Sequence, residues 1–143
     1  MPGDARLSLE RETAEPLYDI LVGDAFSSDA IPAHLLTREA FQLYARRLKP
    51  DGVLALNVST RNLDLGPLVQ GLAESIGKSA VQIVTEKDDE GDPLNARWIL
   101  ITSDKALLER PRIKSLAKEP AAGRPIPRLW TDDFSNLLQV LKR

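Results

Sequence analysis

Residues 18–32 decide the fold of this chain and read YDILVGDAFSSDAIP. A short apolar run over residues 18–23 ends at Asp24, and a loop with a second carboxylate, Asp29, follows it. The run predicts a β-strand with both faces covered, because strands buried on both faces are apolar throughout. In open α/β sheets, ligands bind beyond the carboxyl ends of the strands. Asp24 is therefore a candidate for chemistry rather than for packing.

Helical and strand patterns alternate along the chain after this stretch. Thr37 is a predicted N-cap, and the apolar residues after it recur at helical spacing. Further strands are expected over residues 53–58, 81–85 and 98–102, with a helix over residues 65–76. The last two strands predict a hairpin. The expected fold class is α/β, a partial Rossmann-like three-layer sandwich whose mostly parallel sheet ends in a C-terminal antiparallel hairpin.

The C-terminal part of the chain predicts two more helices. The first covers residues 104–110 and is ended by Pro111, which cannot continue a helix. The second covers residues 131–141, where Asp132 or Asp133 is a candidate N-cap before apolar residues at helical spacing.

Composition narrows the class of protein. The chain has 143 residues, the length of one domain over residues 1–143, with 43% hydrophobic and 28% charged residues. The net charge of −2 and the scattered basic residues argue against nucleic-acid binding. No cysteine is present, and no apolar run resembles a signal peptide or a membrane span. We expect a cytoplasmic protein.

Most candidate site residues also have a purely structural interpretation. Asp4 precedes a predicted helix and is a typical N-cap, and Asp24 and Asp29 are typical of turns. His34, the single histidine, lies in a loop, and without cysteine or a second histidine no metal site is expected. Ser27 and its neighbour lack the glycine pattern of a hydrolase nucleophile.

Four segments resemble the spermidine synthase family of polyamine aminopropyltransferases, which has the class I S-adenosylmethionine-dependent transferase fold. They are Gly3-Asp4-Ala5-Arg6, the Tyr18-Asp19-Ile20 run into Asp24, Leu48-Lys49-Pro50-Asp51-Gly52 and Trp130-Thr131-Asp132-Asp133-Phe134.

The resemblance implies a role for four residues. Asp4 would contact the adenine amino group, with Ala5 beside it. Asp24 would activate the attacking amine, and Asp29 would bind the polyamine substrate. No tightly bound cofactor is implied, because decarboxylated S-adenosylmethionine or S-adenosylmethionine would act as a nucleoside co-substrate.

The Gly-rich turn that opens the fold of this family has no counterpart in the sequence. We therefore expect a C-terminal half of the domain, weakly active or inactive alone, that forms a homo-oligomer through an exposed sheet edge. The alternatives are a methyltransferase-like enzyme of the same fold and a non-catalytic binding or assembly module.

Overall fold

The structure is a computed structural model that describes residues 4–12, 18–26, 31–85, 96–118 and 124–142. The strands are β1 (Tyr18–Gly23), β2 (Leu48–Asn57), β3 (Ser79–Val84), β4 (Arg97–Thr102) and β5 (Ala117–Lys118). The helices are α1 (Ala5–Arg11), α2 (Arg38–Arg47), α3 (Gly66–Ser75), α4 (Lys105–Leu108), α5 (Pro111–Leu116) and the 3-10 helices η1 (Ala33–Leu35) and η2 (Leu137–Val140).

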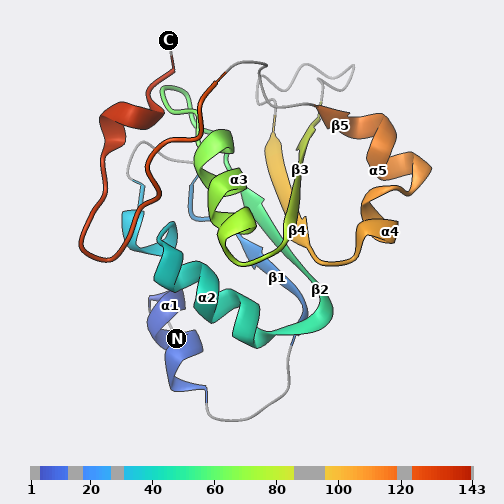
Figure 1. Cartoon of the computed structure of the whole chain (residues 1–143), viewed down its shortest axis with the longest axis horizontal. Coiled ribbons are helices and arrows are strands. Elements are labelled where there is room, and N and C mark those ends of the chain that lie inside the picture. The colour runs from blue at the N-terminus through green and yellow to red at the C-terminus, as the bar shows by residue number, and fades with distance from the viewer. Residues whose placement is uncertain (1–3, 13–17, 27–30, 86–95, 119–123, 143) are drawn as a thin grey trace.

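The five strands form one mixed sheet in the order β1-β2-β4-β3-β5 (Figure 1). β1 and β2 are parallel, as expected for strands joined by a helical crossover, and the other pairs are antiparallel. The predicted hairpin is β3 and β4, and it inserts β4 beside β2. The α/β class and the C-terminal antiparallel hairpin are confirmed, although the sheet is mixed rather than mostly parallel.

Side-chain caps fix the helix starts that the sequence predicted. Asp4 accepts hydrogen bonds from the backbone nitrogens of Arg6 (2.9 Å) and Leu7 (3.2 Å) at the start of α1. Thr37 accepts one from the Ala40 nitrogen (3.1 Å) at the start of α2. Gly77, with φ of 73°, ends α3 in the left-handed conformation that glycine adopts most readily. In the described ranges, each helix is too short or too polar to traverse a lipid bilayer.

The core lies between the sheet and the helices α2 and α3, which cover the same face (Figure 1). Leu54 and Leu56 of β2 and Ile101 of β4 point into it, and each is at most 3% exposed. Trp130 enters from the C-terminal segment and is 0% exposed. Burial of this apolar surface supplies most of the favourable free energy of folding.

The prediction that β1 is covered on both faces is wrong. Ile20 and Val22 of β1 are 61% and 64% exposed. The strand lies at the edge of the sheet, and the described helices that contact the sheet pack on the face to which Leu21 points. An apolar run alone does not distinguish a covered strand face from an open one.

Of the two C-terminal helices that the sequence predicts, the first is found and the second is not. α4 ends before Pro111, as expected, and Pro111 then occupies the first turn of a further helix, α5, because proline fits a first turn whose N–H groups are unpaired in any case. The segment after Trp130 forms an isolated bridge between Thr131 and Phe134, followed by the short η2, instead of one helix. Asn136, not an aspartate, accepts the capping hydrogen bond, from the Leu138 nitrogen.

Candidate functional site

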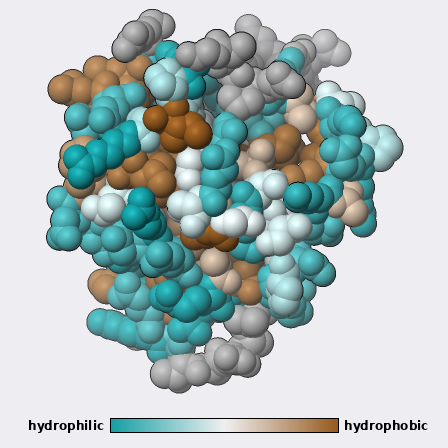
Figure 2. All heavy atoms as spheres, in the orientation of Figure 1, coloured by the Kyte–Doolittle hydropathy of each residue, from teal (hydrophilic) through white to brown (hydrophobic). Residues whose placement is uncertain are grey.

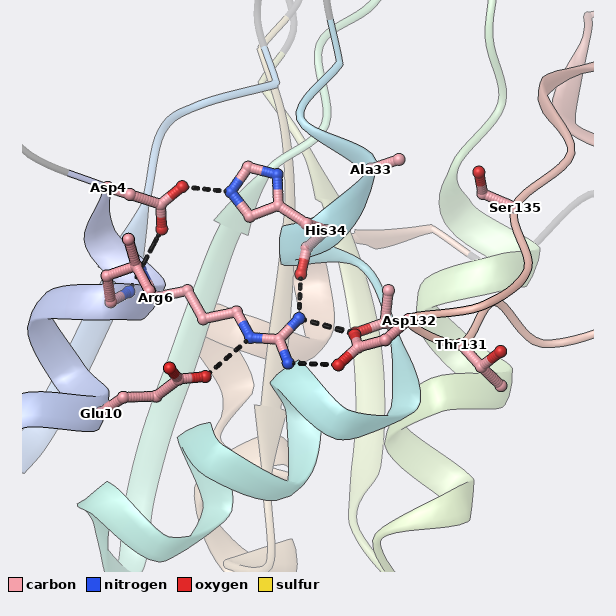
Figure 3. A pocket seen from close by; sticks show the side chains of 10 residues that line it. Asp4, Arg6, Glu10, Ala33, His34, Thr131, Asp132 and Ser135 are labelled. Atoms are coloured by element: carbon pink, nitrogen blue, oxygen red, sulfur yellow. Dashed lines mark hydrogen bonds and ion pairs between the residues drawn. The ribbon is translucent and has the colours of Figure 1, made fainter.

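A polar pocket of about 480 Å³ lies between α1, η1 and the C-terminal segment (Figure 3). We call it the α1 pocket. Its lining residues come from three parts of the sequence and are Asp4, Arg6, Leu7, Glu10, Ala33, His34, Thr37, Thr131, Asp132 and Ser135.

Arg6 crosses the α1 pocket and joins its walls (Figure 3). Its two terminal nitrogens donate to both oxygens of Asp132, at 2.7 and 2.6 Å, and its Nε donates to Glu10 at 3.1 Å. Arg6 also donates a hydrogen bond of 2.9 Å to the carbonyl oxygen of His34, which belongs to a third wall of the pocket. The hydrogen bonds from Arg6 lower the pKa of Asp132 and raise the pKa of Arg6 itself. Both groups are therefore charged at neutral pH.

Asp4 pairs with His34 at the mouth of the pocket. One Asp4 oxygen caps α1, and the other contacts the Nε2 atom of His34. The backbone hydrogen bond from Leu7 lowers the pKa of Asp4, and the contact with His34 lowers it further. An Nε2–H that donates to this carboxylate leaves Nδ1 with a lone pair, so the imidazole offers a ligand an acceptor.

The α1 pocket carries an excess of negative charge. It contains three carboxylates and one guanidinium, so two negative charges remain when His34 is neutral. Within the described part of the chain, Glu10 Oε2, His34 Nδ1 and the Ser135 hydroxyl make no hydrogen bond. Glu10 Oε2 is an acceptor only, the hydroxyl can accept as well as donate, and His34 Nδ1 accepts in the neutral tautomer that carries its proton on Nε2. The pocket thus favours a ligand with positive charge and N–H donors.

Among the residues that the sequence singled out, Asp4 and Ala5 lie at the start of α1 and Asp24 follows β1. Asp4 lines the α1 pocket, whereas Ala5 and Asp24 line a second, more apolar cavity of about 160 Å³ at the end of β1. Asp24 accepts a hydrogen bond of 2.7 Å from the Asn57 amide. Asp29 lies outside the described residues. Asp4 and Asp24 therefore line different cavities.

Sequence reasoning missed Arg6 and Asp132 as site residues. They are 126 positions apart, and no local pattern connects them. Both lie in segments that resemble the spermidine synthases, but the resemblance implies no role for either, and the sequence predicts only a helix cap for Asp132. His34 was interpreted as a lone loop histidine, although it contacts Asp4. Among the described residues, no group of three or more His, Cys, Asp or Glu side chains could hold a metal ion.

We predict that the ion pair of Asp132 makes the free energy of unfolding depend on pH. The pKa of Asp132 in the folded chain is below the ordinary value of 3.8, so its ionised form is stabilised by folding. The contribution of Asp132 to stability is complete above its ordinary pKa and is lost as the pH falls through its lowered pKa. We expect Asp132→Asn to cost about 1 kcal/mol at neutral pH, as for a partly exposed pair, and the difference from the unmodified chain to shrink below a pH of about 4. Urea unfolding across acidic pH measures this, and a difference that does not change with pH would contradict it.

Comparisons with known proteins give little guidance. No protein-family model matches the chain, and no curated protein matches it. Among solved structures, the chain is similar to precorrin 8W decarboxylase from Methanobacterium thermoautotrophicum, with 19% identity and a TM-score of 0.44. The similarity covers 71% of this chain and 53% of that protein, so the chain spans about half of its length. A similarity this low supports no conclusion about activity.

The resemblance to spermidine synthases is corrected by these findings. The chain is similar to a precorrin 8W decarboxylase, and no family model or curated protein connects it to an aminopropyltransferase. The motifs that suggested the family are short, and Asp4 and Thr131 have structural roles in a helix cap and a chain turn. The assignment to the spermidine synthases and to polyamine synthesis is therefore wrong.

Proposed function

We propose that this chain is a binding module that takes up a small organic amine in the α1 pocket. The observation that supports the proposal is the chemistry of the pocket wall, where the atoms left without a partner are acceptors and the net charge is negative. An alkylammonium group supplies three N–H donors and one positive charge, which complements such a wall.

The acceptors divide the wall into two contact regions. Glu10 provides a carboxylate oxygen from α1, and it is 44% exposed on its side chain, so an ammonium group reaches it from solvent. His34 Nδ1 and the Ser135 hydroxyl provide neutral acceptors from η1 and the C-terminal segment. A diamine therefore fits better than a monoamine, because a second amine group can use the neutral acceptors or the solvent-facing carboxylate of Asp132.

Binding of this kind is weak. An exposed ion pair contributes less than about 1 kcal/mol, so several such contacts give a dissociation constant on the order of 1 mM. The same reasoning predicts that added salt weakens the binding, because exposed charges are screened.

Nuclear magnetic resonance titration with putrescine tests the proposal, with 1,4-butanediol as the uncharged probe of the same length and methylthioadenosine as a nucleoside probe. We expect putrescine to shift the backbone resonances of Arg6, His34 and Ser135, and butanediol to leave them unchanged. Glu10→Gln is expected to weaken the binding of putrescine about fivefold, the effect of losing one exposed ion pair.

Glu74→Gln is the matched control, because Glu74 is an exposed glutamate on α3 outside the α1 pocket. It should leave the titration unchanged. Equal shifts with putrescine and butanediol, or shifts confined to residues outside the pocket, would show that the amine is not the recognised group.

A further inference from the structure

His34, the single histidine of the chain, lies on η1 and lines the α1 pocket. Its side chain is 48% exposed, and the surface over α1 and α2 is largely hydrophilic, so water reaches the ring (Figure 2). Histidine is the side chain that ordinarily changes its charge between pH 5 and 8, a range in which carboxyl groups and alkylamines ordinarily keep theirs. A histidine in the wall can therefore change the charge of the pocket without a change in the ligand.

Asp4 decides which ring nitrogen of His34 carries the proton of the neutral form. One Asp4 oxygen accepts hydrogen bonds from the backbone nitrogens of Arg6 and Leu7, at 2.9 and 3.2 Å, so the start of α1 holds the carboxylate in place. The other oxygen contacts Nε2 of His34 (Figure 3). Because a carboxylate only accepts hydrogen bonds, this contact selects the tautomer with its proton on Nε2. Nδ1 is then the nitrogen that takes up a proton when the pH falls.

The other ionisable groups around His34 come from three parts of the fold. They are Asp4, Arg6 and Glu10 from α1 and its cap, Asp132 from the C-terminal segment, and Glu39 and Tyr44 from α2. The backbone hydrogen bond at the start of α1 lowers the pKa of Asp4, and the hydrogen bonds from Arg6 lower the pKa of Asp132, so both carboxylates stay ionised at pH 5. Burial raises the pKa of Tyr44, which therefore stays neutral. Protonation of His34 thus changes the net charge of the pocket from two negative charges to one.

We infer that His34 makes the uptake of an amine by the α1 pocket depend on pH, a regulation that rests on the proposed function. In the neutral form of the ring, Nδ1 offers an acceptor to an ammonium group. In the protonated form, the same nitrogen is a donor, so it faces the N–H groups of the ligand with a like charge. The pocket therefore takes up the amine near pH 8 and releases it near pH 5.5.

Titrations with putrescine at pH 8 and pH 5.5, followed by nuclear magnetic resonance at constant ionic strength, test the inference. Putrescine carries two positive charges at both pH values, because alkylamines lose their proton near pH 10. We expect the dissociation constant to be about tenfold higher at pH 5.5, since the loss of one hydrogen bond and the addition of one like charge are each worth about two- to fivefold. Circular dichroism checks that the chain is folded at both pH values.

His34→Gln is the matched control. Glutamine keeps a hydrogen-bond donor and an acceptor but does not titrate, and the variant retains every other ionisable group of the chain. We expect this variant to bind putrescine with the same affinity at pH 8 and pH 5.5. If the variant kept the tenfold difference, a group other than His34 would cause it, and the inference would be overturned.

The nitrogen-15 resonances of the imidazole ring give a readout that does not depend on binding. Because the chain has one histidine, these resonances belong to His34. We expect Nε2 to be protonated and Nδ1 to be unprotonated at pH 8. A proton on Nδ1 at pH 8, or equal affinities for putrescine at the two pH values, would overturn the inference and leave the proposed function standing. Absence of putrescine binding at both pH values would overturn the proposed function, and the pH dependence with it.

Discussion

Trp130→Ala is expected to lower the free energy of unfolding by about 3–5 kcal/mol, the usual cost of truncating a buried aromatic side chain. Trp130 is 0% exposed and is among the largest fully buried side chains of the core. Its carbonyl oxygen also accepts a hydrogen bond of 2.8 Å from the Arg38 nitrogen at the start of α2. Since a domain is stable by only about 5–15 kcal/mol, the variant should lose a large part of its stability. Urea unfolding followed by circular dichroism measures the change.

Trp130→Phe separates packing from polarity at the same position. The indole Nε1 is buried and has no hydrogen-bond partner among the described residues. Phenylalanine removes this unpaired donor, whose burial costs about 1–3 kcal/mol, and this gain partly offsets the loss of volume. We expect Trp130→Phe to cost no more than about 1 kcal/mol. If phenylalanine were as destabilising as alanine, the indole nitrogen would have to contribute to stability.

Features that depend on neighbouring residues were predictable from the sequence. The caps at Asp4 and Thr37 accept hydrogen bonds from backbone nitrogens within three residues, so composition and spacing were enough to locate α1 and α2. The hairpin of β3 and β4 is also a connection between consecutive strands. The helix predicted over residues 131–141 is wrong for the opposite reason. Its aspartate at 132 binds Arg6 and Thr37 instead of capping a helix, and that contact is not encoded locally.

The candidate site could be predicted only in part. Asp4 was selected from the sequence, and it does line a pocket. Its neighbours in space were not predictable, because the pocket is completed by a segment more than a hundred residues further along the chain. The exposure of Ile20 and Val22 was also unpredictable, since apolar residues on both sides of a strand look the same whether the second face is covered or open.

Arg6→Met is expected to lower the free energy of unfolding by about 2 kcal/mol, the effect of removing hydrogen bonds to charged groups that are partly exposed. Methionine keeps most of the apolar stem, so the loss comes from the guanidinium. The Arg6 side chain is 14% exposed, and its guanidinium connects α1 to Asp132, Glu10 and the His34 carbonyl oxygen. Its removal also leaves Asp132 without the donor that lowers its pKa. The acid dependence attributed above to Asp132 should therefore become weaker in this variant.

Hydrogen exchange should show whether Arg6 holds the C-terminal segment locally or stabilises the whole domain. The bridge between Thr131 and Phe134 is held in place through Asp132, so hydrogen exchange at the Phe134 amide should accelerate more than exchange in β4. Arg11→Met is the matched control, because Arg11 is an exposed arginine at the other end of the same helix. It should change the stability by less than about 0.5 kcal/mol. Equal acceleration of exchange in β4 and at Phe134 would mean that Arg6 stabilises the whole domain and does not specifically hold the C-terminal segment against α1.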